Sequence, residues 1–256
     1  MDVKIKSAAL LLALSIGLVG CVSSSSTTTP SSQGKAVADY MSLAKGYVQE
    51  GFAEKAVKPL KRALEIEPKS AEVHGLLAMV YQIQGESALA ETFFQKALSY
   101  NSKASDVRNN YGAFLFSQGR LPEAYRQFEK ASEDLAYPSR SRTFENMGIV
   151  ALRQGNQSLA IKHFDKALRL NAGLSRASLE LADIYFSQGN NRQAWQYYQR
   201  FSGGARQSAR SLWLGIQLAR LHGKKETVAN YALQLERLYP GSKEWREYRS
   251  RVGYEY

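Results

Sequence analysis

Residues 109–128 read NNYGAFLFSQGRLPEAYRQF, and this stretch contains each element of a pattern that recurs along the chain. Gly119 stands near its centre, with Leu115 four residues before it, Ala124 five residues after it and Phe128 nine residues after it. Glycine ends helices readily because it adopts a left-handed backbone conformation without a steric penalty. The stretch therefore predicts a helix, a tight turn at Gly119 and a second helix.

The same spacing recurs along the chain with a period that identifies the fold class. Successive turn glycines are separated by 34, 34, 36, 34 and 34 residues. They are Gly51, Gly85, Gly119, Gly155, Gly189 and Gly223. This period resembles that of the tetratricopeptide repeat (TPR), a unit of two antiparallel helices, helix A and helix B. One unit cannot bury its own apolar face, so neighbouring units must stack. The sequence predicts an all-α, right-handed superhelical solenoid of about six TPR units.

A set of three residues recurs at fixed distances after each turn glycine and predicts the packing of the helices. Small alanines five and twelve residues after the glycine let the two helices approach, and a bulky residue nine after it is expected to fill the space between a unit and its neighbours. We place the units at 37–70, 71–104, 105–140, 141–174, 175–208 and 209–242. The third has two extra residues near Tyr137 and Pro138, which predicts a longer turn. In the sixth, Val228 and Leu235 replace the expected alanines. Residues 243–256 are predicted to cap the open end.

The N-terminal residues 1–20 are predicted to be a lipoprotein signal peptide. Lys4 and Lys6 precede an apolar stretch at 8–20, which is shorter than the roughly 20 residues that span a bilayer. Residues 18–21, LVGC, resemble the lipobox of bacterial lipoproteins, which implies that Cys21 carries lipid, palmitate included. The alternative is a chance cysteine after an ordinary signal peptide. Val22, where an aspartate would retain a lipoprotein in the inner membrane, resembles an outer-membrane address. Residues 21–36, rich in Ser and Thr, are predicted to be a flexible tether.

Composition and motifs argue against an enzyme. A single cysteine excludes an internal disulfide and a cysteine-based metal site. His74, His163 and His222 lie in different units without metal-ligand spacing, and no HExxH, GxSxG or phosphate-binding loop occurs. An SxxK match at 42–45 falls inside a predicted helix without its accompanying motifs. We predict no catalytic residue, cofactor, metal or small-molecule substrate.

The formal net charge of +11 allows acidic partners, and the part of the chain from residue 175 onward is the more basic. Nucleic acid is not expected as a partner, because the basic residues are spread along the predicted helices and the signal peptide directs the chain out of the cytoplasm.

A partner is expected in the groove lined by the A helices, whose positions 2, 5, 9 and 12 commonly face it. The predicted partner-binding residues are Met41, Val48, Met79, Asn109, Phe116, Ile149, Leu152, Phe186 and Trp213. Met41, Val48, Met79 and Phe116 would form an apolar stripe, and such stripes mark interaction sites. The alternative is that the register is shifted by one and these residues pack in the core. The Lys and Asn pattern that clamps a C-terminal carboxylate is missing, so the groove is expected to take an apolar helix or strand.

The lipobox, the tether and the six repeats together resemble the PilF/PilW family of type IV pilus pilotins. The stretch at 109–128 and three others strengthen the resemblance: YPSRSRTFENMGIVAL at 137–152, ARSLWLGIQLAR at 209–220 and QLERLYPGS at 234–242. The resemblance implies a lipoprotein on the periplasmic face of the outer membrane of a Gram-negative bacterium. It also implies that the lipoprotein sorting pathway delivers the chain with bound secretin subunits, which then form multimers for pilus biogenesis and twitching motility. The alternative is a general periplasmic TPR scaffold lipoprotein that recruits other envelope proteins, such as cell-wall enzymes.

Overall fold

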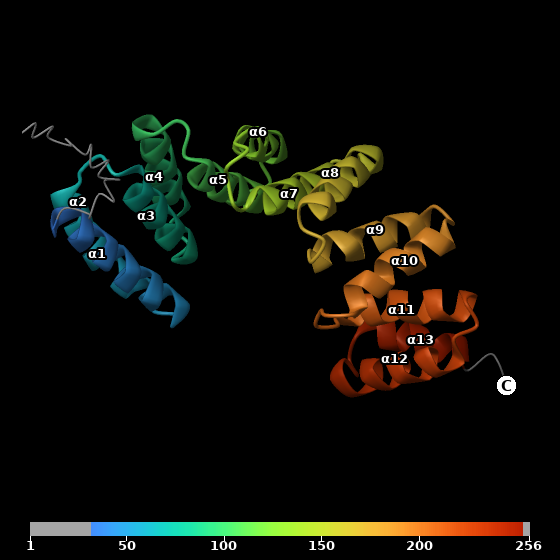
Figure 1. The fold of residues 1–256 in the computed structure, drawn as a ribbon. Coiled ribbons are helices and arrows are strands. Elements are labelled where there is room, and N and C mark those ends of the chain that lie inside the picture. Colours follow the sequence, from blue (N-terminus) through green and yellow to red (C-terminus); the bar gives the residue numbers. More distant parts are fainter. Residues whose placement is uncertain (1–31, 253–256) are drawn as a thin grey trace, which may run out of the picture.

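The computed structural model describes residues 32–252, and all regular structure in that range is α-helical (Figure 1). The helices are α1 (Ser32–Gln49), α2 (Ala53–Ile66), α3 (Ala71–Ile83), α4 (Ser87–Tyr100), α5 (Ser105–Ser117), α6 (Leu121–Ser132), α7 (Arg140–Arg153), α8 (Gln157–Leu170), α9 (Ser175–Ser187), α10 (Asn191–Ser202), α11 (Ala209–Leu221), α12 (Lys225–Leu238) and α13 (Lys243–Val252). Each odd-numbered helix from α1 to α11 packs most closely on the helix that follows it. The odd-numbered helices are therefore the A helices and the even-numbered ones the B helices, and the predicted all-α repeat fold is confirmed.

The turn inside each pair depends on its glycine. All six turn glycines have a positive φ, between 64° and 83°, which strains any residue that carries a Cβ atom. In the third pair, the Gly119 N–H donates to the carbonyl of Phe116 and the Arg120 N–H donates to the carbonyl of Leu115. These two bonds satisfy the carbonyl groups that the end of α5 leaves unpaired. The predicted turn at Gly119 is confirmed.

The predicted alanines and bulky residues form the core of each pair. Every one of them in the first five units is at most 5% exposed. They are Ala56, Leu60, Ala63, Ala90, Phe94, Ala97, Ala124, Phe128, Ala131, Ala160, Phe164, Ala167, Ala194, Tyr198 and Phe201. On the A helix the opposing residue is small. A Cβ atom at Gly148 would lie only 2.5 Å from Cε1 of Phe164, so this ring packs directly on the backbone of α7.

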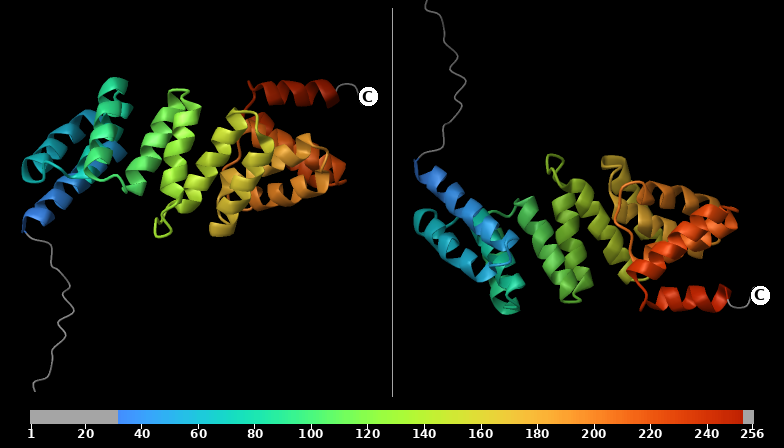
Figure 2. Two further views of the ribbon diagram at one scale, coloured as in Figure 1. Left: turned by 90° about the horizontal axis from the view of Figure 1, so that it is seen from above. Right: turned by 90° about the horizontal axis from the view of Figure 1, so that it is seen from below.

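The pairs follow one another in a curved row, with α1 and α2 at one end and α11 and α12 at the other (Figures 1 and 2). Within the row, each A helix also contacts the next A helix. Gly75 permits one such approach, because a Cβ atom there would lie 2.8 Å from Cγ2 of Val107 on α5. One continuous surface is therefore formed by A helices alone.

Both ends of the row differ from a regular repeat. Helix α1 begins at Ser32, so the expectation that the tether runs to residue 36 is wrong for residues 32–36, which are helical. Val37 and Met41 of this helix are buried in the core that α1 forms with α2 and α3, and that packing stabilises the helix despite the Ser- and Gly-containing start. The signal peptide at 1–20 and the lipidation site Cys21 lie outside the described residues. At the other end, α13 packs on α11 and α12 in the manner of a next A helix.

The longer turn predicted for the third unit is present. Seven residues, 133–139, separate α6 from α7, whereas four, 67–70, separate α2 from α3.

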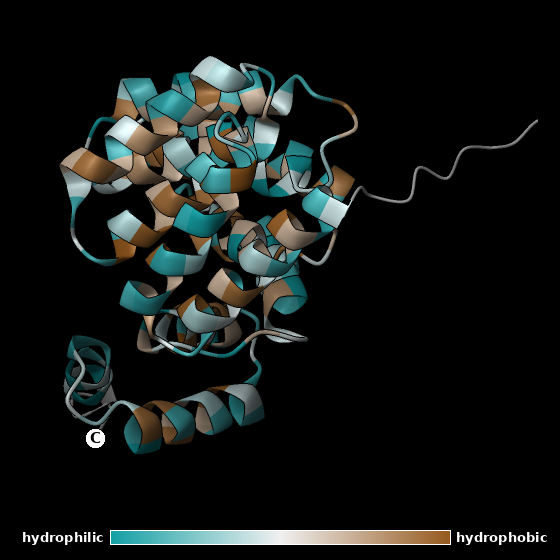
Figure 3. Cartoon of the chain, turned by 90° about the vertical axis from the view of Figure 1, so that its left-hand side faces the viewer, coloured by the Kyte–Doolittle hydropathy of each residue, from teal (hydrophilic) through white to brown (hydrophobic). Residues whose placement is uncertain are grey.

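Polar and apolar residues alternate around the helices, as expected when each buries one face (Figure 3). No helix within residues 32–252 combines the length and the hydrophobicity needed to cross a bilayer.

Candidate partner-binding groove

The first pocket on the A-helix surface lies between α1, α3 and α5, and we call it the N-terminal pocket. It has a volume of about 340 Å³. Its lining residues are Met41, Lys45, Val48, Gln49, Glu72, Gly75, Leu76, Met79, Asp106, Val107 and Asn110. Three of the predicted partner-binding residues, Met41, Val48 and Met79, are thus brought together in one open cavity.

The floor of the N-terminal pocket is apolar and deformable. Met41 is 5% exposed and forms part of the core, while Val48 and Met79 are half-buried and leave apolar surface open. Gly75 adds depth because it has no side chain. The Asn110 side-chain amide donates to Sδ of Met79 at 3.2 Å and so orients the thioether. Methionine side chains adapt to differently shaped apolar groups, which suits a surface that receives a partner.

The rim of the N-terminal pocket is charged, and more of it is acidic than basic. Nζ of Lys45 lies 3.6 Å from Oε1 of Glu72, and both side chains are more than half exposed. An exposed pair of this kind contributes at most about 1 kcal/mol to stability, so both groups can exchange their partner at low cost. Asp106 adds a second carboxylate to the same rim. The rim is suited to a segment that carries a basic side chain beside apolar ones.

A second pocket, which we call the central pocket, lies between α5, α7 and α9. It has a volume of about 140 Å³ and is lined by Ala113, Phe116, Phe128, Asn146, Ile149 and Arg176. Phe116 and Ile149 of the predicted set lie here. The expectation of one apolar stripe that joins Phe116 to Met41, Val48 and Met79 is therefore wrong, because Phe116 lines a different pocket.

Two residues that were predicted to line the groove instead contact a neighbouring helix. Oδ1 of Asn109 accepts hydrogen bonds from Thr143 at 3.1 Å and from Asn146 at 3.3 Å, both on α7. Trp213 is 9% exposed, and the guanidinium of Arg251 on α13 stacks over its ring at 5.1 Å. Both residues stand at repeat position 5, and at these two units position 5 points at the next helix rather than into open space. The expectation that Asn109 and Trp213 line an open groove is therefore corrected.

The two remaining predicted residues, Leu152 and Phe186, are half-buried and pack against the cores of the fourth and fifth pairs. The structure thus brings five of the nine predicted residues into two pockets. A binding role for each of them stays a prediction.

Sequence reasoning missed one row of lining residues. Leu76, Asn110 and Asn146 line the two pockets from repeat position 6, which is absent from the four positions used. Position 6 follows position 2 by about one helical turn, so the two lie on the same face of the helix. The period of the helix could therefore have identified position 6 as a lining position.

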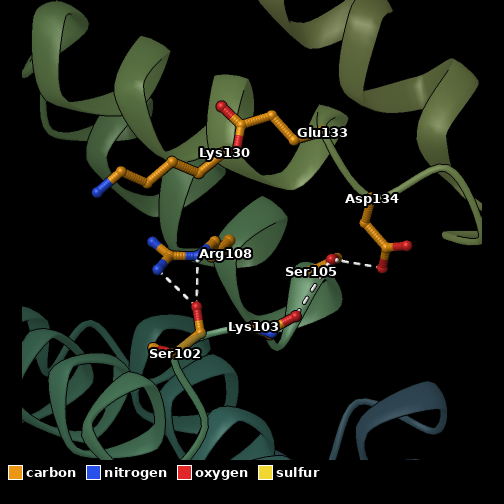
Figure 4. A pocket seen from close by; sticks show the side chains of 7 residues that line it. All are labelled: Ser102, Lys103, Ser105, Arg108, Lys130, Glu133 and Asp134. Carbon is orange, nitrogen blue, oxygen red and sulfur yellow. Dashed lines mark hydrogen bonds between the residues drawn. The ribbon is translucent and has the colours of Figure 1, made fainter.

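A larger, polar pocket lies away from these two, where the connection before α5 meets the end of α6 (Figure 4). Arg108 and Ser105 of this pocket form hydrogen bonds with other residues that line it. The Arg108 guanidinium donates to the carbonyl of Ser102 at 2.6 and 3.0 Å, and the Ser105 hydroxyl donates to Asp134 at 2.8 Å. The Arg108 bonds fasten the connection before α5 to that helix, and the Ser105 bond joins the start of α5 to the connection after α6, so both have a structural role.

The buried histidines have structural partners as well. Nδ1 of His74 lies 2.8 Å from the carbonyl of Ser70, and Nε2 of His163 lies 3.0 Å from the hydroxyl of Tyr125. Burial lowers the pKa of both imidazoles and so favours their neutral form. Within residues 32–252 no three His, Cys, Asp or Glu side chains gather as metal ligands would.

Comparison with known families and structures identifies the repeat. Tetratricopeptide repeat family models match residues 71–103, 103–173 and 146–209. Together these ranges extend from the second unit into the start of the sixth.

Similarity to individual proteins narrows the family further than the repeat alone does. The chain is 44% identical over 246 residues to the type IV pilus assembly protein PilF of Pseudomonas aeruginosa, which covers 95% of this chain and 98% of that protein. The solved structure of PilF from that organism superposes with a TM-score of 0.83 and covers 86% of this chain and 100% of that one. The crystal structure of PilW, described as a widely conserved type IV pilus biogenesis factor, is 27% identical. It superposes with a TM-score of 0.71, covering 83% of this chain and 98% of that one.

Proposed function

This chain belongs to the PilF/PilW family of TPR proteins that act in type IV pilus biogenesis, and we propose that it is the lipid-anchored pilotin of its pilus system. In this proposal it binds subunits of the outer-membrane secretin, accompanies them to the outer membrane and promotes their assembly into multimers. Its contribution is recognition and delivery, and it catalyses no reaction.

One observation carries the proposal: the match to PilF, a type IV pilus assembly protein, extends over nearly the whole of both chains. A shared TPR fold alone supports only protein recognition, because unrelated proteins use the same repeat. A match of 44% that includes the ends of the solenoid supports a shared partner as well.

The N-terminal pocket supports the recognition step. It offers half-buried Val48 and Met79 at the surface formed by A helices, beside exposed charges on its rim. Apolar side chains from one face of a partner helix can enter such a pocket, while the rim charges select among partners. A secretin segment with apolar residues at helical spacing is the occupant that we propose.

Lipid on Cys21 would supply the delivery step. Cys21 precedes the first residue of α1 by eleven positions, which at full extension span at most about 40 Å. The groove would therefore stay close to the membrane surface. Subunits held there experience a high effective concentration of one another, and this favours assembly over aggregation.

The proposal is tested by comparing secretin in membrane fractions of cells with and without this protein. We expect heat-stable multimers in the outer membrane when it is present, and monomers in the inner membrane when it is absent. Normal multimers in the outer membrane of cells that lack the protein would contradict the proposal and favour the general scaffold.

A further inference from the structure

The charge at repeat position 2 changes sign along the A-helix surface. Glu72 on α3 and Asp106 on α5 occupy this position in the N-terminal half. Arg142 on α7, Arg176 on α9 and Arg210 on α11 occupy it in the C-terminal half. One row of equivalent side chains is thus acidic at one end of the groove and basic at the other.

The two pockets are built from the same repeat positions but carry opposite charge. Position 12 provides Val48 in the N-terminal pocket and Phe116 in the central pocket, and position 6 provides an asparagine in each. Position 2 provides Glu72 and Asp106 to the first pocket and Arg176 to the second. The two cavities therefore occupy equivalent places in the repeat, although the central pocket is the smaller, and their position 2 side chains carry opposite charge.

Arg176 is the member of the basic row that is available to a ligand in a pocket. Arg210 is already held by Glu180 and Asp183. Arg176 is exposed, and among residues 32–252 it makes no ion pair with any carboxylate. The nearby Glu145 carboxylate interacts electrostatically with Arg176, but it accepts its hydrogen bond from the Ala177 N–H.

The apolar neighbours of Arg176 strengthen its attraction for an anion. Phe116 and Ile149 line the same small cavity and keep water from one side of it. A carboxylate that reaches the guanidinium there forms a charge-assisted hydrogen bond, and guanidinium groups bind carboxylates in a defined planar geometry.

We infer that the central pocket is a carboxylate-binding subsite for the same polypeptide segment that occupies the N-terminal pocket. The segment carries apolar residues throughout, a Lys or Arg that meets Glu72 and Asp106, and an Asp or Glu that meets Arg176. This opposite charge at the two pockets gives the segment one direction along the groove. The inference rests on the proposed function only in taking the occupant to be a protein segment.

The experiment selects short random peptides displayed on phage against the purified full chain in detergent. We expect the wild-type chain to enrich apolar peptides that contain both an acidic and a basic residue. Arg176→Glu and the milder Arg176→Gln should lower the frequency of acidic residues among selected peptides about tenfold. Asp106→Lys should lower the frequency of basic residues instead.

Arg192→Glu is the matched control. Arg192 is exposed and is the second residue of α10, just as Arg176 is the second residue of α9. Both substitutions therefore place an acid in the first turn of a helix, but α10 is a B helix away from the groove. The control should select the same peptides as wild type.

A synthetic form of the best selected peptide measures the effect directly. Replacing its acidic residue by the corresponding amide should weaken binding to wild type about tenfold and leave binding to Arg176→Gln unchanged. Failure of wild type to enrich any such peptide, or equal acid content after selection on Arg176→Glu, overturns the inference. The secretin comparison above is independent of this result. If the peptides are selected as expected but secretin assembles normally in cells without this protein, only the proposed function is overturned. If secretin assembly fails in those cells but selection on Arg176→Glu keeps its acid content, only the subsite is overturned.

Discussion

The carboxylate of Glu145 on α7 accepts a hydrogen bond of 2.9 Å from the backbone N–H of Ala177, near the start of α9. The residue that precedes α9 is Leu174, whose side chain cannot cap the helix. The first N–H groups of a helix have no partner within the helix, and a nearby oxygen normally satisfies one of them. Here the oxygen comes from the preceding unit, so one side chain both caps a helix and joins two repeats.

Removing this cap should destabilise the solenoid. We expect Glu145→Ala to lower the free energy of unfolding by about 1 kcal/mol, the usual cost of losing a helix cap. Glu145→Gln keeps an oxygen acceptor and should lose less stability than Glu145→Ala at the same pH. Urea denaturation followed by circular dichroism measures both. Glu129→Ala, at an exposed site on α6, is the control and should change little. A loss as large for Glu129→Ala as for Glu145→Ala would refute the capping role.

The same carboxylate should make stability depend on pH. Burial raises the pKa of Glu145, and this outweighs the opposing effects of the Ala177 N–H, Arg176 and Arg142. The folded chain therefore binds this proton more tightly than the unfolded chain does, and its stability contribution falls as pH rises from the unfolded pKa through the raised folded pKa. Glu145→Gln lacks the ionisation. Its stability relative to wild type should rise as the pH increases above about 4, the ordinary pKa of a glutamate, and should level off above the raised folded pKa. A constant or falling difference would contradict this assignment.

Close packing of helix A on helix B predicts a third result. A Cβ atom at Gly148 would lie 2.5 Å from the Phe164 ring, so Gly148→Ala should cost about 1–3 kcal/mol through overpacking. Gly46 in α1 is the matched control, because a Cβ atom there meets nothing within 4 Å. Gly46→Ala should therefore stabilise the chain by about 0.5–1 kcal/mol. Thermal unfolding of both variants measures the two effects, and equal shifts in midpoint would show that this contact does not limit packing.

The repeat could be predicted from the sequence because its determinants are local. Gly119, Ala124 and Phe128 lie within ten residues of one another, and each has a role inside a single helix pair. The pockets could be predicted only in part. A repeat position indicates how a side chain leaves its own helix, whereas Thr143 opposite Asn109, or Arg251 over Trp213, depends on a neighbouring helix.

A single sequence contains no pattern that indicates which residues of different units contact one another. Glu145 and Ala177 are 32 residues apart, and nothing in either residue type indicates the other. The start of α1 was missed for a related reason. Its Ser- and Gly-containing first turn has weak helix propensity, but burial of Val37 and Met41 further along stabilises the whole helix.

The N-terminal pocket predicts a binding defect without a folding defect. Met79 is half-buried in this pocket, so Met79→Glu should place a charge on its apolar floor and weaken binding of secretin subunits about tenfold or more. Met41 is a poorer choice because it is buried in the core. Leu89→Glu is the control, since Leu89 is 42% exposed on the B helix α4. Binding of purified subunits is measured alongside the circular dichroism of each variant. Unchanged affinity of Met79→Glu would move the site elsewhere on the solenoid.

A substitution at the predicted lipid anchor, Cys21, tests membrane localisation separately from partner binding. Cys21→Ser removes the thiol that would carry lipid, while the described helices start at Ser32 and should fold unchanged. Each buried acyl methylene contributes about 0.8 kcal/mol, so losing the chains should release the protein from the outer membrane. Membrane fractionation and incorporation of labelled palmitate measure the change, and Ser24→Ala is the control that should stay lipidated. Purified Cys21→Ser should still bind secretin subunits, because the pockets lie on α1, α3, α5, α7 and α9. Retention of Cys21→Ser in the outer membrane would show that something other than lipid holds the chain there.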